Sequence, residues 1–208
     1  MSARENINVK MLPKHRFDTS APIWWGNLWL LAIETTMFAI AFAAYFYLQQ
    51  NFQLWPPPNT STVFGTDPVP DLTAGTLNVI LLALSCAPMY LMDRAARRGG
   101  QRSVQLWLGV SLLMALAMIV LRYFEFGAMK FQWDSNAYGS ITWAILVLHA
   151  LHLLTVFGEA FLLATWVFTQ PLDMHRRVDA TVLAVYWYWV AGVWIPFYVV
   201  LYFAPRMI

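Results

Sequence analysis

Five long apolar runs dominate the pattern of hydrophobic and polar positions, and charged residues lie almost entirely between them. Each run reaches the roughly 20 residues that a helix needs to cross about 30 Å of hydrocarbon. Lipid offers no partners for backbone N–H and C=O groups, so such runs are expected to be helical. We therefore predict an all-α polytopic membrane protein. Residues 1–23 are the expected N-terminal segment, and residues 24–208 the five-helix domain, with spans at about 24–48, 72–92, 104–126, 138–168 and 180–203.

The basic residues gather in alternate connecting segments. Of the 13 Lys and Arg, four lie before residue 24, four at 94–102 and two at 176–177. Because cytoplasmic loops of membrane proteins carry an excess of Lys and Arg, this distribution predicts a cytoplasmic N-terminus and an external C-terminus. Five spans are the odd number that this orientation requires.

Composition supports a membrane protein and excludes several other classes. Hydrophobic residues make up 60% of the chain and charged residues 12%, whereas soluble domains carry about 25% charged residues. The single cysteine, Cys86, excludes an intrachain disulfide and a paired-cysteine metal site. There is no glycine-rich phosphate loop, and we expect no nucleic-acid partner.

Glu34 is the first candidate functional residue, because an ionisable group inside a span is costly. It has no cation within a helical turn on its own helix, so any partner has to come from elsewhere. One interpretation is a proton-related or lipid-headgroup site, with Trp25 and Trp29 close by in the same run. The other is a hydrogen-bonded packing residue between helices.

The remaining ionisable groups fall on two other spans. Arg122 and Glu125 are three residues apart and share a helix face, which predicts a local ion pair near the outer membrane boundary. His149 and His152 share a face of the fourth span, and Glu159 follows seven residues later on nearly the same side. Two histidines with carboxylates could ligate iron or zinc. No second span carries a histidine, however, so we expect interhelical hydrogen bonds, no metal and no catalytic residue.

Six short motifs occur in order from residue 22 onward and together resemble subunit III of the haem–copper oxidases, in its short five-helix form. They are Pro22-Ile-Trp-Trp-Gly26 with the later Glu34, Trp55-Pro56-Pro57-Pro58, Leu77-Asn78, Glu125 followed by an aromatic residue, Gly139-Ser140 through His149-Ala-Leu-His152, and Tyr186-Trp187 with Val193-Trp194. The chain departs from the family pattern within three of these motifs, and in the fifth Ala150 replaces a glycine. Arg122 stands where glutamine is usual, and Tyr188 and Ala191 replace a histidine and an aspartate. The longer family form also has two further spans at its start.

The resemblance implies a non-catalytic subunit of a respiratory terminal oxidase that reduces oxygen to water and pumps protons. It implies haem and copper in partner subunits and none in this chain. The expected partners are subunit I, subunit II, a small subunit IV as a further candidate, and bound phospholipid. The resemblance further implies a role in stabilising subunit I and supporting proton and oxygen access, in the bacterial cytoplasmic (inner) membrane. Two alternatives remain open: an accessory protein of a nitric oxide reductase, and a small proton-coupled transporter.

Overall fold

The computed structural model describes residues 22–57 and 69–207, without the side chains of residues 174–176. This part of the chain is helical and holds no strand. Its helices are α1 (Pro22–Gln49), α2 (Leu72–Arg97), α3 (Gln101–Gly127), α4 (Ala137–Thr169), α5 (Met174–Tyr202) and the short α6 (Ala204–Met207). The first five are long and apolar enough to cross a membrane. The prediction of an all-α, five-span protein is therefore confirmed.

The helices extend beyond the apolar runs at several ends. α2 continues five residues past Met92 to Arg97, and α5 begins at Met174, six residues before the run that starts at 180. A hydrophobic run marks only the part of a helix that lies in hydrocarbon. Outside it, water and headgroups satisfy charged side chains, so the helix continues while the hydropathy falls. Most of the expected segment 1–23 lies outside the described residues.

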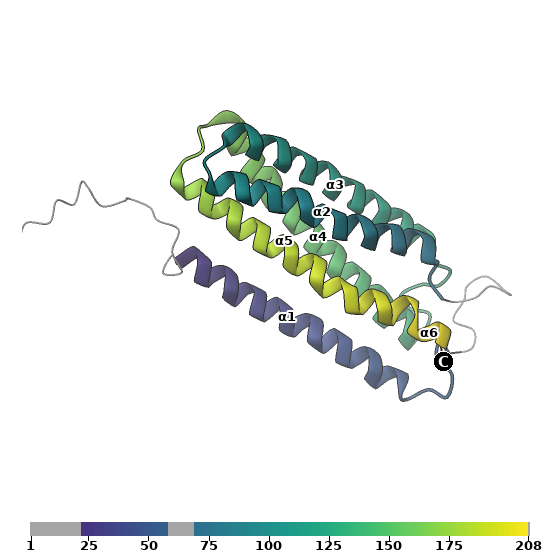
Figure 1. Cartoon of the computed structure of the whole chain (residues 1–208). Coiled ribbons are helices and arrows are strands. Elements are labelled where there is room, and N and C mark those ends of the chain that lie inside the picture. The colour runs from purple at the N-terminus through teal and green to yellow at the C-terminus, as the bar shows by residue number, and fades with distance from the viewer. Residues whose placement is uncertain (1–21, 58–68, 208) are drawn as a thin grey trace, which may run out of the picture.

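Helices α2 to α5 pack together, and α1 lies along one side of them (Figure 1). α1 contacts only α4 and α5 among the described helices. Its buried side chains are Asn27, Phe38 and Tyr45. The helix therefore leaves most of its surface open to lipid or to a partner.

Two features fix the ends of the bundle. Between α2 and α3, Gly99 adopts φ 74°, and a Cβ at this position would lie 2.7 Å from the Arg177 guanidinium. At the other end, the buried Trp55 donates a hydrogen bond from Nε1 to the Tyr45 hydroxyl at 2.9 Å. Arg206 Nη2 donates to the Pro70 carbonyl at 2.7 Å. The loop after α1 and the C-terminal turn are thereby held against the same end of the bundle.

Candidate functional site

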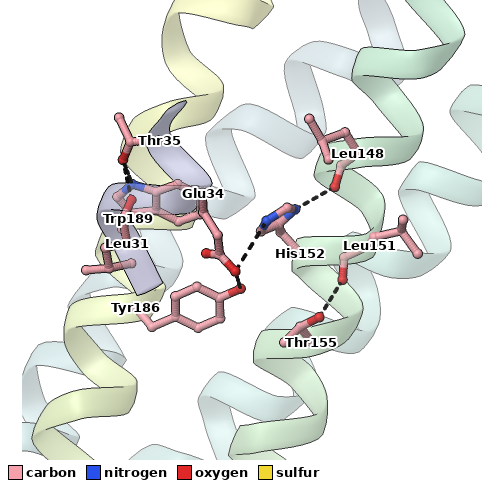
Figure 2. A network of polar contacts seen from close by, with 9 residues as sticks. All are labelled: Leu31, Glu34, Thr35, Leu148, Leu151, His152, Thr155, Tyr186 and Trp189. Atoms are coloured by element: carbon pink, nitrogen blue, oxygen red, sulfur yellow. Dashed lines mark hydrogen bonds and ion pairs between the residues drawn. The ribbon is translucent and has the colours of Figure 1, made fainter. Parts of the chain in front are cut away.

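Glu34 finds its partners on two other helices, as Figure 2 shows. Its Oε1 lies 3.7 Å from Nε2 of His152 on α4. The hydroxyl of Tyr186 on α5 donates to the same oxygen at 3.4 Å. We call Glu34, His152 and Tyr186 the Glu34 cluster. It joins α1 to both of the helices that α1 contacts.

The hydrogen bonds of His152 determine where its protons lie. Nδ1 is 2.7 Å from the Leu148 carbonyl oxygen, which can only accept, so Nδ1 carries a hydrogen. In a neutral ring Nε2 is then a bare acceptor, and it faces Glu34. An acceptor facing an ionised carboxylate is unfavourable. The geometry therefore favours one further proton on the pair, on Glu34 or on His152.

Neighbouring contacts hold the Glu34 cluster in place. Trp189 Nε1 on α5 donates to the Thr35 hydroxyl on α1 at 2.8 Å (Figure 2). The buried Phe38 packs edge-on against the His152 ring, with centroids 5.0 Å apart. The polar contacts that α1 makes through Glu34 and Thr35 thus lie beside aromatic rings that pack between α1, α4 and α5.

A second polar cluster joins α3, α4 and α5, and we call it the Arg122 cluster. Arg122 Nη1 lies 2.9 Å from Glu125 Oε2, and both side chains are 3% exposed. The guanidinium also packs on Trp194, 4.3 Å from the ring centroid. The Tyr202 hydroxyl donates to Glu125 Oε1. The ion pair expected from the spacing of these two residues is therefore present, and α5 encloses it.

His149 has both ring nitrogens engaged in the Arg122 cluster. Arg122 Nη2, which can only donate, lies 2.9 Å from Nδ1, so Nδ1 accepts. The hydrogen is then on Nε2, which donates to the Val190 carbonyl at 3.3 Å. The ring stacks on Trp194 with centroids 4.2 Å apart. His149 in this arrangement offers no free lone pair to a metal. In the described part of the chain, no three His, Cys, Asp or Glu side chains lie close enough to hold a metal ion.

Glu159, another residue singled out from the sequence, lines a groove between α1, α4 and α5. This α1 groove has a volume of about 640 Å³, and its lining includes Asn27, Leu30, Glu159, Trp166 and Asp179. Glu159 lies in this groove, and no hydrogen bond or ion pair to the Glu34 cluster was found for it. Trp25 and Trp29 are 52% and 68% exposed. They lie on the open surface of α1, outside the Glu34 cluster.

Sequence reasoning missed the aromatic partners from α5. Tyr186 and Trp194 were recognised only as motif residues, and Tyr202 was not singled out. A tyrosine hydroxyl or indole N–H within a span usually finds a partner. That general rule was the only signal available.

Comparisons with known proteins agree with this architecture. The family model described as cytochrome c oxidase subunit III matches residues 6–205. The chain is 26% identical to cytochrome c oxidase subunit 3 of Synechocystis sp., over 85% of this chain and 73% of that protein. It is 23% identical to the subunit 3 of Thermostichus vulcanus, over 87% of each chain. For the Bacillus subtilis protein the identity is 26%, over 85% of this chain and 84% of the relative. The match spans all five membrane helices, and the chain belongs to the cytochrome c oxidase subunit III family.

Proposed function

We propose that this chain is the non-catalytic subunit III of a respiratory haem–copper terminal oxidase. The observation that carries the proposal is the family match, which runs from residue 6 to residue 205. The internal chemistry supports it, because Arg122, Glu125 and His149 are engaged with one another inside the bundle. In this proposal, oxygen reduction takes place at haem and copper held by partner subunits.

The proposed partners are subunits I and II, with a small subunit IV as a further candidate. The open surface of α1 supports lateral packing, since α1 contacts only α4 and α5 among the described helices. Large apolar side chains such as Ile33 and Ile40, 61% and 64% exposed, lie on this helix. Packing this surface against subunit I would stabilise the catalytic subunit in the membrane.

The proposed orientation has the N-terminus in the cytoplasm of a bacterium and the C-terminus outside. The α2–α3 turn, with arginines at 94, 97, 98 and 102, lies at the same end of the bundle as the start of α1 (Figure 1). One end of the bundle therefore carries most of the described basic residues, as the positive-inside rule requires of a cytoplasmic face. The membrane in this proposal is the inner membrane.

Lipid organisation and proton or oxygen access are the proposed local roles. The α1 groove has the volume of a ligand pocket, and its lining is largely apolar with Asn27, Glu159 and Asp179 among the polar residues. We propose that phospholipid binds there. The Glu34 cluster lies between the same three helices and brings the Glu34 carboxyl to 3.7 Å from the His152 imidazole. In this proposal the cluster supports proton uptake by the complex, and the metals are held by partner subunits.

The test is a mild-detergent pull-down of the tagged chain from native membranes. A redox difference spectrum and mass spectrometry would identify what co-purifies. A haem-bearing catalytic subunit together with a copper-carrying subunit II is the expected result. Nitric oxide reductase subunits would favour the accessory-protein alternative. A colourless chain without oxidase subunits would contradict the proposal.

A further inference from the structure

A second polar layer lies two helical turns from the Glu34 cluster, on the same three helices. Each of its members is seven residues from a member of that cluster, and seven residues bring a side chain back to nearly the same helix face about 10 Å along the axis. The members are Asn27 on α1, Glu159 on α4 and Asp179 on α5, and all three line the α1 groove. We call them the Glu159 layer.

The Glu159 layer lies at one boundary of the membrane. Asp179 immediately precedes the apolar run that begins at residue 180, so its level marks where the hydrocarbon begins on α5. Two residues before it, the Arg177 side chain lies against Gly99 in the turn between α2 and α3. The layer is therefore at the end of the bundle that carries the arginines of that turn, which is the cytoplasmic end in the proposed orientation.

Glu159 lacks a counter-charge within the described part of the chain. Its side chain is exposed, and no hydrogen bond or ion pair joins it to another described residue. Among the described residues that line the α1 groove, none is Lys, Arg or His, whereas Glu159 and Asp179 carry carboxyl groups. An ionisable side chain at membrane depth is costly without a partner. The charge of the groove therefore fits a cation that comes from outside the described chain.

The surroundings of the Glu159 layer fit a lipid molecule better than a free cation. Toward the middle of the membrane the lining of the groove is apolar, with Leu30, Val182 and Leu183. Leu30 is exposed, and the exposed Met37, seven residues further on, continues the same face of α1. A polar site at the membrane boundary with an apolar strip leading inward from it matches the head group and the acyl chains of a phospholipid.

We propose that the α1 groove selects an aminophospholipid of the phosphatidylethanolamine class, whose primary ammonium group donates hydrogen bonds to the carboxylates of Glu159 and Asp179. The proposal rests on the phospholipid binding proposed above for this groove, and it names the head group. A primary ammonium has three donors and no acceptor, and hydrogen bonds between oppositely charged groups are the strong ones. Phosphatidylglycerol carries only the negative charge of its phosphate, which the two carboxylates repel. The groove therefore distinguishes the two head groups by charge.

The experiment offers the full chain two lipids that have the same acyl chains. The purified chain is mixed at neutral pH with equal amounts of phosphatidylethanolamine and phosphatidylglycerol, and bound lipid is counted by native mass spectrometry. We expect about a tenfold preference for phosphatidylethanolamine at one site, the effect of one hydrogen bond between charged groups. Equal retention, or a preference for phosphatidylglycerol, would overturn the head-group assignment and leave phospholipid binding in place. Retention of neither lipid would contradict both and would assign the groove to a protein partner.

Charge substitutions locate the preference. Glu159→Gln together with Asp179→Asn removes both charges with little change of shape, and it should abolish the preference while the chain still retains lipid. The control is Asp134→Asn, because Asp134 is an exposed carboxylate in the connection between α3 and α4, at the opposite end of the bundle. This control should keep the preference. A preference that survives the double substitution would place the lipid elsewhere and refute the assignment.

A change of volume tests the groove itself. Gly26 lines the α1 groove, and no atom lies within 4 Å of a Cβ added there. Gly26→Leu should therefore occupy the groove without disturbing the helices and lower the retention of phosphatidylethanolamine. Gly109→Leu makes the same change on α3, which α1 does not contact, again with nothing within 4 Å of the new Cβ, and it should have no effect. Unchanged retention in Gly26→Leu would exclude this groove as the binding site.

Discussion

Removal of one charge from the Arg122 cluster should destabilise the bundle far more than removal of both. The two charged groups are 2.9 Å apart and 3% exposed. At that separation their Coulomb attraction is about 6 kcal/mol for an effective dielectric constant of about 20, before the cost of removing both groups from water. Glu125→Gln leaves the guanidinium unbalanced, and breaking a buried pair in this way costs about 3–5 kcal/mol.

The double variant R122Q/E125Q removes both charges and leaves two amides that can hydrogen-bond to each other. We expect it to recover most of the stability lost in Glu125→Gln. The control is Arg97→Gln, because Arg97 is 54% exposed and its pair with Asp93 spans 3.0 Å. Exposed pairs contribute about 0–1 kcal/mol, so this variant should resemble the unsubstituted chain.

The assay is thermal unfolding of the full chain in detergent, followed by tryptophan fluorescence. For a chain of this size, 1 kcal/mol corresponds to about 2–4 °C. Glu125→Gln should therefore lower the midpoint by about 10 °C, and the double variant by only a few degrees. A double variant as unstable as Glu125→Gln would refute the reasoning, because the loss would then come from the hydrogen bonds of the carboxylate and not from the unpaired charge.

Three further predictions follow from other parts of the molecule. Glu34→Gln should leave the metal centres of the complex spectroscopically intact while lowering lipid retention or activity over many turnovers, and a changed haem spectrum would contradict the role proposed for Glu34. Gly99→Ala should destabilise the chain by about 1 kcal/mol or more, because its φ is 74° and an arginine side chain lies 2.7 Å from the new Cβ; Gly109→Ala, with nothing within 4 Å of its Cβ, should be neutral or stabilising in the same thermal assay. A cysteine introduced at Asp71, in a background without the native cysteine, should react with an impermeant reagent from outside, and one at Arg98 from inside; the reverse labelling would overturn the proposed orientation.

Hydropathy was sufficient to predict the five spans, because the solvent imposes the same requirement on every one of them. A run of about 20 apolar residues has one stable backbone solution in lipid. The Arg122–Glu125 pair was also predictable, since a spacing of three residues brings two side chains to one helix face whatever surrounds the helix. The charged ends of α2 and α5 could not be predicted from hydropathy. Hydropathy marks the part of a helix that lies in hydrocarbon, and it does not mark where the helix itself begins or ends.

The partners of Glu34 could not be predicted from the sequence for a different reason. Glu34 and Tyr186 are 152 residues apart, and Glu125 and Tyr202 are 77 apart. Which side chains meet across helices depends on how each helix is rotated about its own axis. The five spans are apolar around most of their circumference, so the pattern of hydrophobic positions does not determine that rotation. The contacts of the polar side chains and of the aromatic residues of α5 determine the rotation of each helix.

The charges of the buried polar residues balance within the Arg122 cluster. Arg122 brings one positive charge to the interior of the bundle, and Ala191, which is 8% exposed, brings no charge. The Glu125 carboxylate lies 2.9 Å from the guanidinium and balances it, and His149 accepts from Arg122, which disfavours a second positive charge there. The Arg122 cluster is thus neutral as a whole, and the membrane cost of a charged residue is met inside this chain. A subunit that balances its own buried charges can fold before it meets its partners, so we expect assembly with the catalytic subunit to depend on the open surface of α1 and not on the Arg122 cluster.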